Sequence, residues 1–170
     1  MDLFNSKDHW LYFASANLPE FDEYAYNVMN MESSNLVRIL RGAHCRTERE
    51  LFHEFSAALQ FPYFFGNNWD ALLDLLVRLS WYRFEGIVLL ISDTDEVLVD
   101  EEASFGTLLQ VLEQCASIWS SDIDIYGGKR SHYIPFRVLL HSTPSQEMRA
   151  WERLDMAGFA RKARTLSELG

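Results

Sequence analysis

The sequence predicts an α/β fold built on a small three-stranded parallel sheet, and three observations support this prediction. The 170 residues suit about one principal domain. Hydrophobic residues make up 48% of the chain, which is enough for a packed core and too much for a disordered acidic chain. Three short apolar segments, 35–41, 86–91 and 136–141, have the length of strands, and segments with helical spacing separate them. Strands that alternate with helices favour a parallel sheet with right-handed crossovers.

The first strand and the first helix of this region carry clear end signals. Asn35–Arg41 is rich in branched apolar residues and is followed by a glycine, which is typical of a strand. Thr47 and Glu50 have the spacing of a capping box, and apolar residues follow at helical spacing as far as Leu59. Pro62 then prevents the helix from continuing.

The remaining central elements follow from similar patterns. A second helix is predicted over about 69–79, with Asn67 or Asn68 as its cap. Residues 86–91 form a continuous apolar run, which indicates a strand buried on both faces. A third helix is predicted over 105–119, and the third strand follows it. The predicted order is therefore strand, helix, helix, strand, helix, strand.

We expect three parts in the chain. Residues 35–142 form the central domain, with an insertion at about 118–134 that alternates around a Gly-Gly pair as a hairpin would. Residues 1–34 are rich in aromatic side chains without a clear period, and we interpret them as an accessory N-terminal segment that packs on the domain. Residues 143–170 are interpreted as a C-terminal helical extension.

The net charge limits the kinds of partner that the protein can have. Fifteen Lys and Arg against 25 Asp and Glu give a formal charge of −10. Binding to nucleic acid needs clustered cations to neutralise phosphates, and an anionic membrane surface attracts the same groups. The composition therefore argues against both partners. Small molecules, metals and basic proteins remain.

The acidic residues are concentrated in the middle of the chain. Residues 81–126 contain ten acids against the single Arg83, whereas residues 127–170 contain eight basic residues against four acids. We expect the acidic stretch to act mainly through its field, which would attract a cationic partner without contacting it.

The cysteines and the N-terminal residues suggest a reducing compartment. Cys45 and Cys115 are far apart and have no metal-binding spacing, so neither a disulfide framework nor a structural zinc site is expected. Two unpaired thiols suit the cytoplasm. The first ten residues lack the apolar stretch of a signal peptide, and the longest apolar run is far too short to span a membrane.

The helix predicted over 69–79 separates its apolar and acidic residues. On a helical wheel, Asp70 and Asp74 lie on the side opposite the leucines that would face the core, and Leu73 and Val77 flank the two acids. Apolar residues around paired acids on an outer face are typical of an interface. A plainer interpretation is also open, because Asp70 suits the positive end of the helix dipole and Asp74 suits solvent.

The residues around this helix resemble the signature of the barstar family of ribonuclease inhibitors. That signature combines a proline, aromatic residues, a glycine, an asparagine, Asp-Ala-Leu, and a second aspartate four residues after the first. This sequence has Pro62, Phe64, Phe65, Gly66, Asn68, Asp70-Ala71-Leu72 and Asp74 in that order. The resemblance covers about 35–142 and leaves out 1–34 and 143–170.

The resemblance implies a barstar-like fold, with a three-stranded parallel sheet packed with helices, and an intracellular inhibitor or immunity protein without enzymatic activity. Its expected partner is a basic toxin protein, most simply a ribonuclease, whose active site it blocks. Asp74 would be the central anchor and Asp70 a second acidic contact. The other partner-binding residues would come from the preceding loop, the same helix and the third helix: Phe64, Gly66, Asn67, Asn68, Trp69, Leu73, Val77, Gln110, Glu113 and Gln114.

Three departures from the family pattern leave a second function open. Phe64 replaces a tyrosine, Leu73 replaces a tryptophan and Gln114 replaces a glutamate. Such changes remove groups of the kind that often dominate binding. They suggest either a different toxin or a regulatory interaction module whose partner is not a nuclease.

An enzyme is a weaker alternative. Paired carboxylates can hydrolyse glycosides, but they must then lie across a cleft and not on one convex helix. The same pair offers too few ligands for Mg²⁺, and no catalytic or phosphate-binding motif is present. No cofactor and no metal site are therefore expected. The five histidines are expected at the surface or as caps: His9, His44, His53, His132 and His141.

Overall fold

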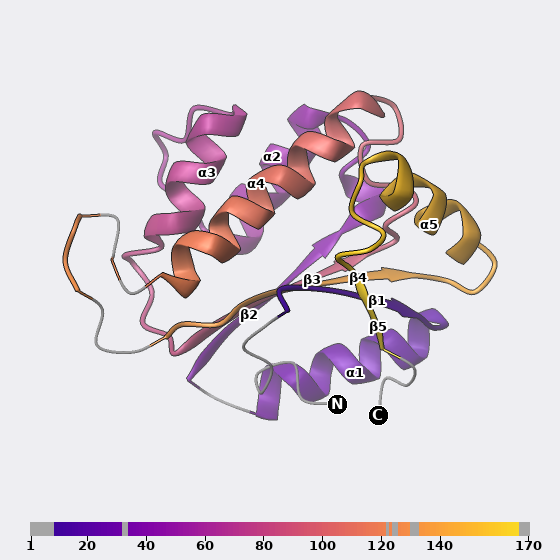
Figure 1. Ribbon diagram of the computed structural model, residues 1–170, viewed down its shortest axis with the longest axis horizontal. Coiled ribbons are helices and arrows are strands. Elements are labelled where there is room, and N and C mark those ends of the chain that lie inside the picture. Colours follow the sequence, from indigo (N-terminus) through magenta and orange to yellow (C-terminus); the bar gives the residue numbers. More distant parts are fainter. Residues whose placement is uncertain (1–8, 32–33, 122, 124–125, 130–132, 167–170) are drawn as a thin grey trace.

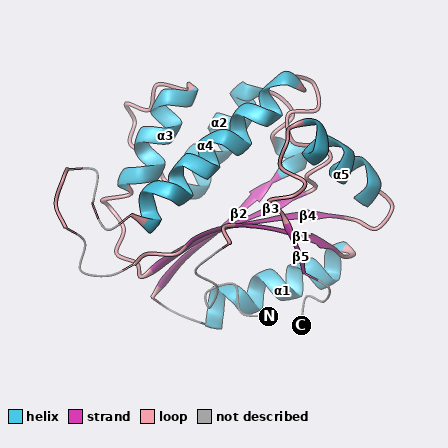
Figure 2. Ribbon diagram, viewed as in Figure 1, coloured by secondary structure: helices cyan, strands magenta, loops and turns pink. Residues whose placement is uncertain are grey.

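A computed structural model describes residues 9–31, 34–121, 123, 126–129 and 133–166. The fold is a five-stranded, entirely parallel sheet in the order β2-β3-β4-β1-β5. Helix α1 covers one face of the sheet, and α2, α3, α4 and α5 cover the other (Figures 1 and 2). The elements are β1 (Leu11–Ser15), α1 (Leu18–Met31), β2 (Asn35–Arg41), a short 3-10 turn (Gly42–His44), α2 (Glu48–Leu59), α3 (Trp69–Arg78), β3 (Gly86–Ser92), α4 (Ala103–Ser120), β4 (Phe136–Ser142), α5 (Glu147–Met156) and β5 (Arg164–Leu166).

The prediction of a parallel α/β fold is confirmed, but the prediction of three strands is wrong. β2, β3 and β4 are the expected strands, and two more come from the flanking segments. β1 pairs with β4 through Leu11 opposite Val138, and β5 pairs with β1. All seven residues of β4 are buried, so its backbone groups need a hydrogen-bonded neighbour on both sides. β1 supplies that second neighbour.

The sheet separates two apolar cores. The larger core lies under α2 to α5, and the smaller one lies under α1 and includes Tyr12, Phe21, Val88 and Leu139. Because both faces are covered, all residues of β3 and β4 are buried, and β3 is apolar almost throughout, without alternating polar residues. α4 packs on the central sheet, and α3 packs along α4.

The predicted end signals of α2 are confirmed. Thr47 Oγ1 accepts a hydrogen bond from the Glu50 backbone N–H, and the Glu50 carboxylate accepts one from the Thr47 backbone N–H. The helix ends at Gln60, whose φ of 50° places it in the left-handed region, and Pro62 follows. This sharp end begins the loop that leads into α3.

A connector of residues 93–102 joins β3 to α4 and contains many of the acids counted in the sequence. Arg46 forms ion pairs with Glu96 and Asp100, and Asp95 is buried and accepts a hydrogen bond from Ser142 Oγ. Arg153, on α5, binds Glu102. These internal partners lower the free charge of the acidic stretch, so the field expected from its composition is smaller than the count suggests.

His141 corrects the expectation that the histidines lie at the surface. Its ring is fully buried on β4, stacks on Phe21 with 4.1 Å between ring centroids, and places Nε2 2.9 Å from the Ala16 carbonyl oxygen. Burial lowers the pKa of this histidine below its ordinary value. The cysteines are buried as well, and burial raises the pKa of the Cys45 thiol to about 12.

The insertion and the C-terminal extension are partly described. Ile123 and Lys129 form an antiparallel bridge, as a hairpin predicts, while residues 122, 124–125 and 130–132 lie outside the described residues. The helix predicted after residue 143 is α5.

Candidate partner-binding site

The start of α3 is fixed by its cap. Asn68 Oδ1 accepts a hydrogen bond from the Ala71 backbone N–H at 2.8 Å, and Asn68 Nδ2 donates one to the Gly66 carbonyl oxygen at 3.2 Å. A Cβ atom at Gly66 would lie 3.0 Å from that amide nitrogen, so glycine leaves room for the cap. Asn67 precedes the cap with a φ of 49°. Of the two candidate caps, Asn68 is the one observed, and the loop and helix are joined by its side chain.

The predicted wheel of α3 is confirmed for the leucines and the acids. Leu72, Leu75 and Leu76 are buried in the large core, and Asp70 and Asp74 are exposed on the outer side. The Asp74 side chain is 52% exposed. Asp70 lies in the first turn, where the helix dipole favours a carboxylate. The two acids therefore form an accessible anionic surface, which we call the α3 acidic face.

The prediction that Val77 lies on the outer surface is wrong, and Leu73 is only partly exposed. The wheel placed both beside the acids on the outer surface, but Val77 is only 7% exposed and Leu73 is half-buried. The reason is tertiary: α3 packs along α4, and Val77 joins the same core cluster as Val111 and Ala116 of that helix. A second helix thus covers the flank of α3 that the wheel, which considers one helix alone, leaves open.

The loop before α3 presents two aromatic side chains to solvent. Tyr63 is fully exposed and Phe64 is 67% exposed, and their rings contact each other edge to face. Phe65 turns inward and packs against Phe52 and Phe61. The Phe65 ring therefore anchors the loop in the core, and the rings of Tyr63 and Phe64 are exposed to solvent. Tyr63, which sequence reasoning did not select, is the more exposed of the pair.

Trp69 connects α3 to α2 and is half-buried. Its indole Nε1 donates a hydrogen bond to Glu48 Oε1 at 3.1 Å, and its ring packs edge to face on Phe52. These contacts hold the N-terminal end of α3 against the start of α2. The exposed part of Trp69 lies next to Asn68 and Asp70 in the chain and remains available at the rim.

The three α4 residues that the sequence selected differ in their surroundings. Gln110 and Gln114 are exposed. The two carboxylate oxygens of Glu113 accept hydrogen bonds from Lys162 Nζ, at 2.7 Å for Oε1 and 2.9 Å for Oε2. The Glu113 side chain is therefore turned toward the segment after α5. We place Gln110 and Gln114 ahead of Glu113 as candidates for contact with a partner.

Arg78 is a charged group at this face that the sequence analysis missed. Its Nε donates to Asp74 Oδ1 at 2.8 Å, and this hydrogen bond raises the pKa of the arginine. The i,i+4 spacing of Asp74 and Arg78 was the available signal. Arg78 also contacts Tyr126 of the insertion, which lies beside the end of α3 (Figure 1).

A family model for barstar, the barnase inhibitor, matches residues 35–141. The chain belongs to the barstar family. The match runs from β2 into β4 and includes the α3 acidic face and the loop before it. Barstar is described as the inhibitor of barnase, so the family is one of inhibitors.

Solved structures resemble the fold over nearly the whole chain. A chain of the structure of Drosophila ORC bound to AT-rich DNA and Cdc6 has a TM-score of 0.51 and 9% identity, covering 96% of this chain and 49% of that one. The structure of the Aeropyrum pernix ORC2 protein, in ADPNP-ADP complexes, has a TM-score of 0.54 and 11% identity. The match covers 94% of this chain and 42% of that one. The chain spans about half the length of these structures or less, and at such identities the likeness concerns the fold alone. No curated protein matches the sequence.

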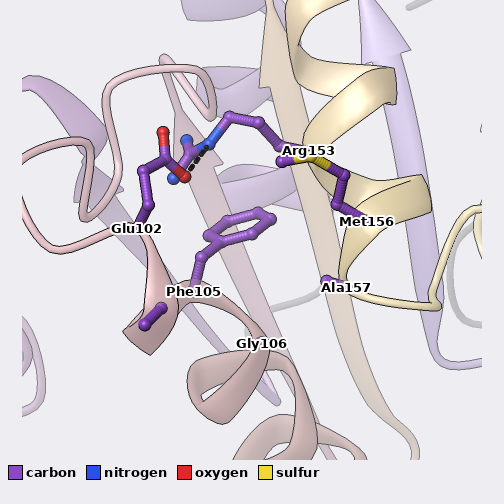
Figure 3. Close-up of a pocket in the computed structure, with 7 residues that line it drawn as sticks. Glu102, Phe105, Gly106, Arg153, Met156 and Ala157 are labelled. Carbon is purple, nitrogen blue, oxygen red and sulfur yellow. Dashed lines mark hydrogen bonds and ion pairs between the residues drawn. The ribbon is translucent and has the colours of Figure 1, made fainter.

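The barstar-family chain also has a pocket of about 300 Å³ between the start of α4 and the end of α5 (Figure 3). Arg153 lines it, donating to Glu102 Oε2 at 3.0 Å and to the backbone carbonyl oxygens of Thr94 and Val97. Its guanidinium also lies over the Phe105 ring, 4.2 Å from the centroid. Each nitrogen of the Arg153 guanidinium makes one of these internal hydrogen bonds, so this group ties α5 to the connector.

Two further properties concern the described residues alone. They include no group of three or more His, Cys, Asp or Glu side chains placed to hold a metal ion. Within the same part of the chain, no helix combines the length and the hydropathy that a membrane span requires.

Proposed function

We propose that this protein is an inhibitor, or immunity protein, that blocks the active site of a basic ribonuclease toxin with the α3 acidic face. The observation that carries the proposal is the exposure of Asp70 and Asp74 on one side of α3, in a chain of an inhibitor family. Tyr63 and Phe64 add exposed aromatic surface in the loop before the helix. Acids with aromatic neighbours are a suitable surface for a cationic cleft.

The chemistry of the expected target supports this assignment. A ribonuclease active site must hold phosphates and stabilise a charged transition state, so it is lined with cations. Two carboxylates on one helix can take the places of substrate phosphates, and hydrogen bonds between such ions are short and strong. Asp74 would be the anchor, with Asp70 as the second contact and Gln110 or Gln114 of α4 at the margin. Binding would need no catalysis by this chain and no cofactor, and would take place in the cytoplasm of the cell that makes the toxin.

The decisive experiment is protection from a toxin. The chain is coexpressed with the basic ribonuclease toxin encoded beside it, and survival is compared for the parent and for Asp70→Asn/Asp74→Asn. We expect the double variant to lose protection. Glu152→Gln/Asp155→Asn removes the same charge from exposed positions on α5 and should protect fully. Equal protection by the α3 variant and the parent would show that this face is not the site.

A second function is favoured by the departures at Leu73 and Gln114. These positions lack the tryptophan and the glutamate of the family pattern, and Leu73 is half-buried. A surface without those groups suits a regulatory partner that is not a nuclease. Affinity capture with the parent and with Asp70→Asn/Asp74→Asn separates the two. Recovery of a basic nuclease domain by the parent alone supports inhibition, whereas recovery of a non-nuclease regulator supports the second function.

A further inference from the structure

The carboxylate of Asp74, which the proposed function requires for binding, already forms an ion pair with Arg78 of the same chain. Arg78 Nε lies 2.8 Å from Asp74 Oδ1, and the two side chains are 42% and 52% exposed. Any cation of a partner that approaches Asp74 therefore meets a positive charge that is bound there. The contact also shows that Asp74 can accept a guanidinium in a normal hydrogen-bonding geometry.

Arg78 has a second contact on the other side. Its Nη1 donates a long hydrogen bond to Tyr126 Oη at 3.5 Å, and its Cζ lies 5.9 Å from the centroid of the Tyr126 ring. An arginine at this distance from a tyrosine ring makes a cation–π contact. Tyr126 is 74% exposed and belongs to the insertion between α4 and β4. Arg78 is thus placed between an acid of α3 and an aromatic ring of the insertion.

We propose that Arg78 is an intramolecular competitor, which holds Asp74 against the partner's cation and moves fully onto Tyr126, which it already contacts, when the partner docks. The proposal rests on the proposed function, because it concerns the same face. An exposed i,i+4 ion pair is weak and can be displaced. A partner with one mobile cation only replaces Arg78, whereas a cleft with several fixed guanidiniums gains contacts that Arg78 cannot provide. Displacing Arg78 lowers the affinity of every cation that uses Asp74, so only a strongly cationic active site still binds tightly.

The test measures affinity at low salt by calorimetry, with barnase and with a hexa-arginine peptide as probes. Arg78→Gln is expected to tighten the binding of both probes about fivefold, because the competitor is lost. Arg83→Gln removes the same charge from an exposed position before β3 and serves as the matched control. In an Asp74→Asn background, Arg78→Gln is expected to change nothing. Equal tightening by Arg83→Gln, or unchanged or weaker binding with Arg78→Gln, would overturn the proposal.

Tyr126 is tested by a double-mutant cycle. Tyr126→Leu is expected to weaken binding of the peptide about threefold when Arg78 is present, because the displaced arginine loses its alternative contact, and to have no effect in Arg78→Gln. Equal effects in both backgrounds would remove Tyr126 from the mechanism. The peptide distinguishes a failure of the proposed function from a failure of the proposal for Arg78. If the parent neither binds barnase nor protects from the adjacent toxin, the proposed function fails, and the peptide still reports whether Arg78 competes for Asp74.

Discussion

The acids of the connector and the acids of the α3 acidic face are the same kinds of residue with different partners, although the side chains of Asp100 and Glu102 are about as exposed as that of Asp74, at 51%, 47% and 52%. In the connector, Asp95 is buried, Glu96 and Asp100 bind Arg46, and Glu102 binds Arg153. On α3, Asp70 and Asp74 are exposed, and the arginine that binds Asp74 is itself exposed. The connector holds α2, α4 and α5 together through its acids. The α3 face keeps its acids where another molecule can reach them.

This difference teaches that the number of acids in a segment says little about its role. The connector lies in the most acidic part of the chain, whereas the α3 segment is nearly neutral in total. An acid with a buried internal partner stabilises the fold, and an acid with solvent around it can bind. Substitutions in the connector should therefore change stability, and substitutions on α3 should change binding.

The largest expected effect is at Arg153. Arg153→Ala leaves the carbonyl oxygens of Thr94 and Val97 without their buried donor and removes the contact with the Phe105 ring. We expect a loss of about 3 kcal/mol in the free energy of unfolding, measured by urea denaturation. Arg149→Ala, at an exposed position of the same helix, should cost little. A loss below about 1 kcal/mol for Arg153→Ala would remove the stabilising role assigned to the connector.

The ion pair of Glu54 with Arg41 tests whether a paired acid outside the connector also stabilises the fold. Its carboxylate accepts hydrogen bonds from the backbone N–H, Nε and Nη2 of Arg41, and these bonds hold its pKa below the usual value. Because the folded-state pKa is lowered, the pair stabilises the protein above the ordinary pKa near 4.5 and this stability disappears as the pH falls through the folded value. Glu54→Gln should cost about 1 kcal/mol at pH 7.

At pH 3 the difference between Glu54→Gln and the parent should shrink, as measured by urea denaturation at both pH values. Glu23→Gln, at an exposed position of α1, is the control and should cost nothing at either pH. A cost for Glu54→Gln that is the same at both pH values would show that the ion pair is not its source.

A smaller effect is expected at Arg46. It binds Glu96 and Asp100, but its side chain is 41% exposed, so solvent and salt weaken both pairs. Arg46→Ala should lower the free energy of unfolding by less than about 1 kcal/mol, and 1 M NaCl should remove most of the difference. A large cost that persists in salt would place Arg46 with Arg153 as a packed, buried group.

The smallest effect on stability is expected on α3. Asp74→Asn should change the free energy of unfolding by no more than about 0.5 kcal/mol, because the pair with Arg78 is exposed. Thermal melting of the parent and the variant measures this, alongside the binding assays above. A strong loss of stability would break the comparison, since Asp74 would then belong with the acids of the connector.

Local signals in the sequence predicted the central fold and the two acids. The capping box at Thr47 and Glu50, the cap at Asn68, and the apolar run of β3 act over a few residues, and the structure contains each of them. Asp70 and Asp74 are exposed, as the wheel predicted. Their role in binding stays a prediction.

Features that depend on distant residues could not be predicted. β1 is buried on both faces between β4 and β5, so its aromatic residues show no alternation that would mark a strand. β5 has three residues, two of them exposed. Val77 is covered by α4, and His141 is held by Phe21 and Ala16 of another part of the chain. In each case the decisive neighbour lies far away in the sequence.

The position of β1 in the sheet determines when, during synthesis, the protein can finish folding. Leu11 is made early by the ribosome, but its partner Val138 emerges only after β2, β3 and four helices have been synthesised. Pairings between such distant segments form late, because a long loop must close first. Under the proposed function, a cell that releases the toxin at the same moment would need a store of finished protein, because a growing chain could not yet bind.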